Sequence, residues 1–253
     1  MNLLILTDSD RQADGRYRLR GRRAGHVLDV LRCGVGDTVE VGLLNGPKGI
    51  GRIETVHGRT LVLDCTFDED TSDQRTAIDL ICALPRPQVF KRVLETVGTM
   101  GVRNLHIINS KRVEKCYFSA SVMQDTVIRK HLLMGLSQGR NTHLPQVSVH
   151  RRFKVFFNET FDAMDAREKH KARKLLPDPD ADNYMAGGKG GFLPRIIVAI
   201  GPEGGWIPRE VEMMAEKGFE RFVLGPWPLR VENAVVAAVS QIQLVFSKDM
   251  RKK

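Results

Sequence analysis

The feature that most constrains this fold is a change in the spacing of apolar residues near residue 76. Before it, over 35–67, apolar and polar residues alternate in short runs separated by Gly-Asp, Asn-Gly and His-Gly pairs. After it, short wholly apolar runs alternate with longer segments of helical spacing. The first pattern is typical of strands joined by turns, and the second indicates a mostly parallel sheet covered by helices. A chain of 253 residues has room for both.

The first part, residues 1–70, is predicted to form a small β-barrel with one helix. An apolar strand at 3–6 opens it, and apolar residues at helical spacing predict a helix within 21–32. The polar and acidic stretch 68–76 is interpreted as the linker to the second part.

The second part, residues 76–253, is predicted to be an α/β domain. Strands are expected at 77–84, 104–109, 196–200 and 221–225, and helices at 89–101, 124–139, 208–217 and 232–247. The region near 160–194 interrupts this pattern with charges, prolines and glycines, which favours a surface insertion that is partly disordered. In such sheets, binding sites lie at the carboxyl ends of the strands.

The charge distribution favours a polyanionic partner. The net charge is +9, and residues 11–32 hold seven arginines against two acidic residues. Arginine binds phosphate bidentately and stacks on bases, which suits RNA, although a solvated charged face is the alternative. His26 fits an RNA contact or ordinary packing equally well. The candidate RNA-binding residues are Arg18, Arg20, Arg22, Arg23, His26 and Arg32.

A glycine turn in "IIVAIGPEGGWIPREVEMMAEKG" (196–218) follows an apolar run and precedes a helical pattern. Such a turn often cradles phosphate, but the carboxylate of Glu203 would repel one. Either the ligand offers hydrogen-bond donors or positive charge, as S-adenosylmethionine does, or Glu203 holds a neighbouring loop in shape. The stretch "GGKGG" (187–191) follows no strand and lacks the Ser or Thr of a phosphate loop, so a flexible loop is expected.

Several classes of protein are disfavoured by what the sequence lacks. The four cysteines form no CxxC pair and no zinc-spaced cluster with histidine, so no metal is expected. The start lacks the features of a secretory signal, and no apolar run is long enough to span a bilayer. We therefore expect a soluble cytoplasmic protein without a membrane partner, with an organelle left open as an alternative.

The stretch "AIGPEGGWIPREVEMMAEKGFERFVLGPWPLRVENA" closely resembles the signature of the RsmE family, the small-subunit ribosomal RNA uridine-N3 methyltransferases of the SPOUT superfamily. Similar agreement is found in "RRAGHVLDVLRCGVGDTVEVGLLNGPKG", "ALPRP", "NSKRVEK" and "GLSQGRNTHLPQV". The resemblance implies a PUA-like barrel followed by a SPOUT-type α/β domain with a C-terminal trefoil knot. It also implies methyl transfer from S-adenosylmethionine to N3 of a uridine in 16S-type ribosomal RNA within the small ribosomal subunit.

The resemblance further implies the site residues by position. Arg230 would favour the imide anion of the uridine, and Glu232 is a candidate proton acceptor by its location alone. Cofactor binding is implied for Ile200, Gly201, Glu203, Gly204, Gly205, Leu224, Gly225, Leu229, Arg230 and Ala234.

Two positions depart from the family pattern. Trp227 stands where the family usually has arginine, and Asn233 stands where it usually has threonine. Trp227 can stack on a base or on adenine but cannot bind a phosphate. These departures leave two alternatives open: an RNA-binding protein with weak or no catalysis, and a methyltransferase that acts on another RNA.

A homodimer with shared donor pockets is also implied by the resemblance. The final helix is apolar around much of its circumference, which supports a second contact face, although burial within one domain is the alternative. Val239 and Ile242 are expected on the shared face.

Overall fold

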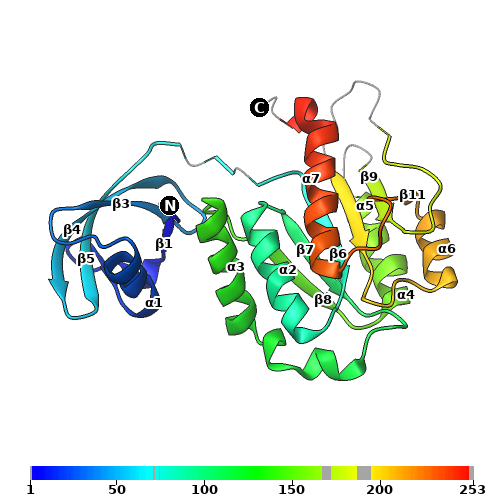
Figure 1. The fold of residues 1–253 in the computed structure, drawn as a ribbon, viewed down its shortest axis with the longest axis horizontal. Helices are drawn as coiled ribbons and strands as arrows, with labels where there is room; N and C mark the ends of the chain where they lie inside the picture. Colours follow the sequence, from blue (N-terminus) through cyan, green and yellow to red (C-terminus); the bar gives the residue numbers. More distant parts are fainter. Residues whose placement is uncertain (1, 71, 74, 167–171, 187–194, 251–253) are drawn as a thin grey trace.

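The computed structural model describes residues 2–70, 72–73, 75–166, 172–186 and 195–250 (Figure 1). Within these residues lie a five-stranded sheet and a six-stranded sheet, side by side. The first sheet ends at Phe67 and the second begins at Ile78, so the change of apolar spacing near residue 76 falls between them.

The N-terminal sheet has the strand order β1-β3-β4-β5-β2, in which β1 is parallel to β3 and the other pairs are antiparallel. Its core includes the fully buried Leu6, Leu19, Ile53 and Leu63. Its elements are β1 (Leu4–Leu6), η1 (Asp8–Asp10), β2 (Tyr17–Leu19), α1 (Gly21–Gly25), the π-helical η2 (His26–Val30), β3 (Thr38–Leu43), β4 (Lys48–His57) and β5 (Thr60–Phe67).

The second sheet has the order β11-β9-β10-β6-β7-β8, and each of its strand pairs is parallel. Every residue of β6 and β10 is buried, because these central strands are covered on both faces. This burial explains why the residues of both strands are apolar except Asp79, and the parallel sheet confirms the predicted α/β class. The strands are β6 (Ile78–Ala83), β7 (Asn104–Ile108), β8 (Gln146–His150), β9 (Arg173–Pro177), β10 (Ile196–Ile200) and β11 (Glu220–Phe222).

Three helices, α2 (Pro87–Thr99), α3 (Asp125–Gly139) and α7 (Val231–Met250), lie side by side on one face of this sheet (Figure 1). The short elements are η3 (Lys115–Ser119), η4 (Ser121–Met123), α4 (Phe153–Val155), η5 (Phe156–Phe161) and α5 (Asp162–Ala166), and α6 (Pro208–Glu216) precedes β11. No helix within the described residues is both long enough and apolar enough to cross a membrane.

The close approach of α2 and α3 depends on glycine. A Cβ added at Gly98 of α2 would lie 2.6 Å from the Leu132 carbonyl oxygen, and one at Gly135 of α3 would clash with the Glu95 carbonyl. Only residues without a side chain allow this approach of α2 and α3.

The joint between the two sheets is formed by α3 and the segment after it. The Leu3 N–H donates to the Ser137 carbonyl at 3.0 Å, and the Ser137 hydroxyl donates to the Leu3 carbonyl at 2.6 Å. Leu3 and Ile5 pack on Leu136, and the Thr142 hydroxyl donates to the Gly46 carbonyl at 2.7 Å. The "GLSQGRNTHLPQV" stretch therefore connects the N-terminal sheet to the α/β part.

The expectation of a surface insertion near 160–194 is wrong for 173–177. This segment forms β9, which pairs with both β10 and β11, and its Leu175 and Leu176 are buried. A run this short between charged segments gives a weak apolar signal. The expected flexible loop at 187–191 lies outside the described residues.

Helix α7 does not present the residues that its sequence suggested for a shared face. Val239 and Ile242 are fully buried against the helix's own sheet layer, whereas Val236 is 43 % exposed and Leu244 is 77 % exposed. The apolar residues of α7 thus form a buried side, with Val239 and Ile242, and a narrower outward stripe, with Val236 and Leu244.

Candidate functional site

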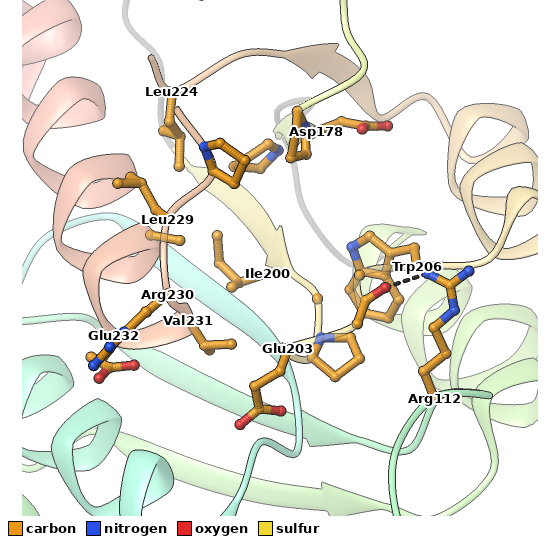
Figure 2. Close-up of a pocket in the computed structure, with 18 of the residues that line it drawn as sticks. Arg112, Asp178, Ile200, Glu203, Trp206, Leu224, Leu229, Arg230, Val231 and Glu232 are labelled. Carbon is orange, nitrogen blue, oxygen red and sulfur yellow. Dashed lines mark hydrogen bonds between the residues drawn. The ribbon is translucent and has the colours of Figure 1, made fainter. Parts of the chain in front are cut away.

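A cavity of about 1230 Å³ opens at the carboxyl ends of β6, β9, β10 and β11 (Figure 2). Its walls come from the segments that follow these four strands, as expected where neighbouring parallel strands end together. The structure brings all the site residues suggested by the two C-terminal motifs to this cavity: Ile200, Gly201, Glu203, Gly204, Gly205, Leu224, Gly225, Leu229, Arg230, Glu232 and Ala234.

One side of the cavity is apolar. Figure 2 shows Ile200, Leu224, Leu229 and Val231 around a common space. Ile200 and Val231 are buried, whereas Leu229 is 43 % exposed. A surface of this kind fits a flat, weakly polar group such as a purine ring.

The glycine turn after β10 is fixed by its own backbone. The Gly205 N–H donates to the Pro202 carbonyl at 2.8 Å, and Gly205 has φ +70°, a conformation that strongly favours glycine. A Cβ at Gly201 would lie 3.2 Å from Nε1 of Trp206. That indole nitrogen is buried without a hydrogen-bond partner among the described residues. The turn thus leaves open backbone facing the cavity.

Glu203 has a structural contact that answers why a carboxylate stands in this turn. Its Oε1 accepts a hydrogen bond from the Arg86 N–H at 2.9 Å, immediately before the first residue of α2. Helix starts carry unpaired N–H groups and a partial positive charge, which a carboxylate stabilises. This contact supports the interpretation that Glu203 holds a neighbouring loop in shape.

Burial and then the charge of Glu203 raise the pKa of the nearby Cys82 thiol to about 12. Cys82 is fully buried and stays protonated at neutral pH, so it is no candidate nucleophile or base.

The loop after β7 supports the turn from the other side. Arg112 donates from Nη1 to the Gly204 carbonyl (Figure 2). Buried Glu210 accepts from the Lys111 N–H at 2.8 Å through Oε1 and from the Ile207 N–H at 3.1 Å through Oε2. One side chain therefore joins this loop to the start of α6.

Several cavity residues were missed as site residues by the sequence reasoning. They are Arg86, Gln88, Val89, Arg92, Arg112, the 177–180 segment, Pro202, Trp206, Pro208, Val211, Glu212, Arg221, Trp227, Pro228 and Val231. The "ALPRP" and "NSKRVEK" stretches hold Arg86 and Arg112, and both follow predicted strands. Arg86 and Arg112 could have been identified as site residues because each follows the carboxyl end of a predicted strand.

Glu232 and Arg230 differ in how their charges are satisfied. The Glu232 side chain is only 12 % exposed; its Oε1 accepts from Nη1 of Arg92 at 3.1 Å, and its Oε2 is buried without a partner among the described residues. Arg230 is exposed, and its guanidinium makes no hydrogen bond or ion pair within the described chain. An unpaired carboxylate oxygen and an open cation at one cavity are both available to a ligand.

A second hollow, of about 460 Å³, lies at the edge strand of the N-terminal sheet. It is lined by Ser9, Asp10, Arg11, Gln12, Ala13, Arg18, Arg20 and Arg23. Across the part of the chain that the structure describes, the guanidinium groups of Arg11, Arg18 and Arg20 make no hydrogen bond or ion pair. Three unpaired guanidiniums at one hollow form a suitable site for phosphate.

Arg23 differs from these three because it binds within the protein. It donates to both carboxylate oxygens of Asp10, at 2.6 and 2.7 Å, and to the Ile5 carbonyl at 2.8 Å. Burial alone would raise the pKa of Asp10, but hydrogen bonds from Arg23 and Thr7 outweigh it and lower that pKa.

The remaining RNA candidates lie outside this hollow. Arg22 and Arg32 are exposed, whereas His26 is partly buried and its Nε2 has no partner within the described chain. In the described ranges, no three His, Cys, Asp or Glu side chains gather so as to hold a metal ion.

Comparisons with known proteins agree with this geometry. Residues 72–243 match the family model described as an RNA methyltransferase domain. Ribosomal RNA small subunit methyltransferase E 1 of Borreliella burgdorferi is 24 % identical over 94 % of this chain and 95 % of its own. The corresponding protein of Treponema pallidum is 26 % identical over 88 % and 83 %.

A solved structure gives the same fold. Ribosomal RNA small subunit methyltransferase E from Neisseria gonorrhoeae, bound to S-adenosyl methionine, matches with a TM-score of 0.73 at 20 % identity, over 96 % of this chain and 97 % of that one.

The fold and the matched model together define the class: the chain belongs to the RNA methyltransferase domain family. The curated relatives then narrow the class, and the RsmE family suggested by the C-terminal motifs is confirmed.

Proposed function

We propose that this protein is an S-adenosylmethionine-dependent methyltransferase that acts on N3 of a uridine in small-subunit ribosomal RNA. The observation that carries the proposal is the single cavity into which both C-terminal motifs bring their residues. The names of the relatives, and the ligand bound to the Neisseria protein, support the same activity.

The residues present fit the methyl donor. The apolar side formed by Ile200, Leu224 and Leu229 suits adenine, and the turn at Gly204 and Gly205 lets a ligand approach the backbone closely. Gly201, Gly225 and Ala234 are small enough to complete the wall. When bound, S-adenosylmethionine supplies an activated methyl group.

The chain's own charged residues supply the rest of the chemistry. N3 of neutral uridine carries a proton, which must be removed before the nitrogen can act as a nucleophile. Glu232 has a carboxylate oxygen without a protein partner and is the proposed proton acceptor. Arg230 is the proposed cation that stabilises the resulting imide anion. Because N3 lies on the pairing edge of the base, the target uridine must be unpaired or flipped out.

RNA binding is assigned to the N-terminal unit, residues 1–70, which we infer to be PUA-like, and the methyltransferase unit to 76–253. The unpaired arginines at the hollow beside β2 would contact phosphates, and Arg22 and Arg32 would extend the same basic surface. Arg23 would help mainly by holding Asp10 and the hollow in shape.

We also infer a C-terminal trefoil knot and a homodimer, as the family resemblance implies. The outward stripe of α7, with Val236, Ser240 and Leu244, is the proposed dimer contact, in place of the buried Val239 and Ile242. Such an enzyme would act in the cytoplasm, where bacterial ribosomal subunits assemble.

The test is methylation of small ribosomal subunits from a strain that lacks this enzyme, followed by nucleoside mass spectrometry. The expected product is N3-methyluridine, formed by the wild type and strongly reduced in Glu232→Gln. Glu212→Gln is the matched control and should retain activity, because Glu212 is an exposed cavity residue whose side chain makes no hydrogen bond or ion pair within the described residues. Donor binding without methyl transfer would support the alternative of an RNA-binding protein with weak or no catalysis. Methyl transfer to another RNA would support the alternative of a methyltransferase with a different substrate.

A further inference from the structure

Trp227 is a large, exposed side chain at the cavity that the proposed chemistry does not use. Its ring is 78 % exposed, yet it lines the cavity together with Leu229 and Arg230. A single exposed apolar residue is common and does not by itself identify a site. Its position and its surroundings carry the argument instead.

The backbone around Trp227 is restricted. Pro226 and Pro228 flank it. Each proline has a fixed φ, and Pro228 also disfavours a helical backbone at Trp227, the residue before it. A ring presented on a restricted loop loses less conformational freedom when it binds a ligand. The loop therefore presents an open aromatic face at the cavity at a low entropic cost.

The surroundings of this ring are cationic. Arg86, Arg92, Arg112 and Arg230 are exposed and line the same cavity. The guanidinium groups of Arg86 and Arg230 make no hydrogen bond or ion pair within the described residues. An aromatic face beside unpaired cations fits a nucleotide, whose base stacks while its phosphate is neutralised, better than it fits the apolar surface of another protein copy.

The cavity is also larger than one donor requires. Its volume of about 1230 Å³ exceeds the range of about 300–1,000 Å³ that is usual for a single small-molecule site. The donor's adenine already has a fitting apolar side at Ile200 and Leu224, away from solvent. The exposed ring of Trp227 is thus left for a second planar group.

We propose that Trp227 is the platform on which a nucleobase of the substrate RNA stacks at the cavity. This inference rests on the proposed function, because it takes RNA as the ligand. It makes Trp227 a substrate-binding residue in a position where the family usually has arginine.

The experiment compares Trp227→Ala and Trp227→Tyr with the wild type in binding to small-subunit ribosomal RNA transcribed in vitro. If a base stacks on the ring, Trp227→Ala should raise the Kd for this RNA by about 5- to 140-fold. Trp227→Tyr keeps a ring and should stay within about threefold of the wild type. Tyr184→Ala is the control, because Tyr184 is an aromatic residue that is 65 % exposed but does not line the cavity.

Two further measurements separate the other roles of the ring. Calorimetry with S-adenosylmethionine should give the same affinity in all variants, and sedimentation should give the same assembly. RNA binding by Trp227→Ala equal to the wild type would overturn the proposal. So would a matching loss of donor affinity, which would assign the ring to adenine, or a loss of assembly, which would assign it to a second copy.

Failure of the proposed function can be recognised independently. A wild type that binds the RNA but transfers no methyl group would remove the enzyme assignment, while the stacking comparison would still be measured by binding alone.

Discussion

Replacing Glu210 by alanine should loosen the candidate site without touching any residue that is proposed to meet ligand. Glu210 is 6 % exposed and accepts two backbone hydrogen bonds, from Lys111 at 2.8 Å and from Ile207 at 3.1 Å. It is also the acidic residue in the first turn of α6. The substitution leaves both N–H groups without their acceptor and removes a negative charge from a helix start.

The expected loss of stability follows from these three contributions. An unsatisfied, partly buried N–H costs about 1–3 kcal/mol, and we assign about 1–2 to Lys111 and about 0.5–1 to the longer bond of Ile207. The charge at the helix start adds about 0.3–1 kcal/mol. Together the free energy of unfolding should fall by about 2–4 kcal/mol, which for a chain of this size lowers Tm by about 5–15 °C.

The assay is urea unfolding at neutral pH, followed by calorimetric titration with S-adenosylmethionine. Glu210→Gln keeps an acceptor for one of the two N–H groups and should lose about half as much stability as Glu210→Ala. Glu216→Ala, at an exposed position of the same helix, is the matched control and should change stability by less than about 0.5 kcal/mol. Donor affinity should fall in Glu210→Ala because the loop that carries Arg112 to the Gly204 carbonyl is no longer fixed.

A Glu210→Ala protein as stable as the Glu216→Ala control would refute this reasoning. Equal losses in the Ala and Gln variants would refute the assignment to hydrogen bonds, because the amide oxygen can still accept one.

Three further predictions concern pH, assembly and RNA. Burial lowers the pKa of His106 to about 4, so the unfolded chain binds the proton more tightly between pH 6.5 and 4, and stability should fall by about 3 kcal/mol as the pH drops through that window. His106→Asn should remove this share of the pH dependence in urea unfolding. Val236→Glu, on the outward stripe of α7, should convert a two-chain assembly into a folded single chain in sedimentation; an unchanged assembly would exclude this face. Arg18→Ala and Arg20→Ala should each lower the slope of log affinity against log salt by about 1, with Arg52→Ala as the control from the same sheet.

The sequence predicted the α/β part well where burial is complete. β6 and β10 are buried along their whole length, so all their residues except Asp79 are apolar, and their positions were predicted within about a residue or two. β9 is also paired on both sides, with β10 and β11, but only its two leucines are buried, and the charged segments around it predict an insertion instead. This segment is a strand because it pairs with β10 and β11, and the local sequence pattern carries no information on that pairing.

The part of the site that consists of residues from the two C-terminal motifs was predictable from the sequence. Those motifs follow β10 and β11, and their residues meet because parallel strands end at one edge of the sheet. The contacts of Glu203 with Arg86 and of Glu210 with Lys111 join residues far apart in the sequence. Such contacts are set by strand order, which sequence spacing does not specify. The sequence therefore allowed that Glu203 holds a neighbouring loop but did not identify the loops after β6 and β7 as the ones supporting the site.

The joint at Ser137 and Leu3 has a consequence for target selection. Two hydrogen bonds and a small apolar cluster fix β1 on α3, and this holds the arginine hollow at a set distance from the cavity. If a phosphate of the RNA is held at the hollow, only a uridine at a matching span along the folded RNA reaches Glu232. The modified nucleotide would then be selected by its distance from the phosphate that is bound at the hollow. A glycine inserted after Ser137 would change which position is modified.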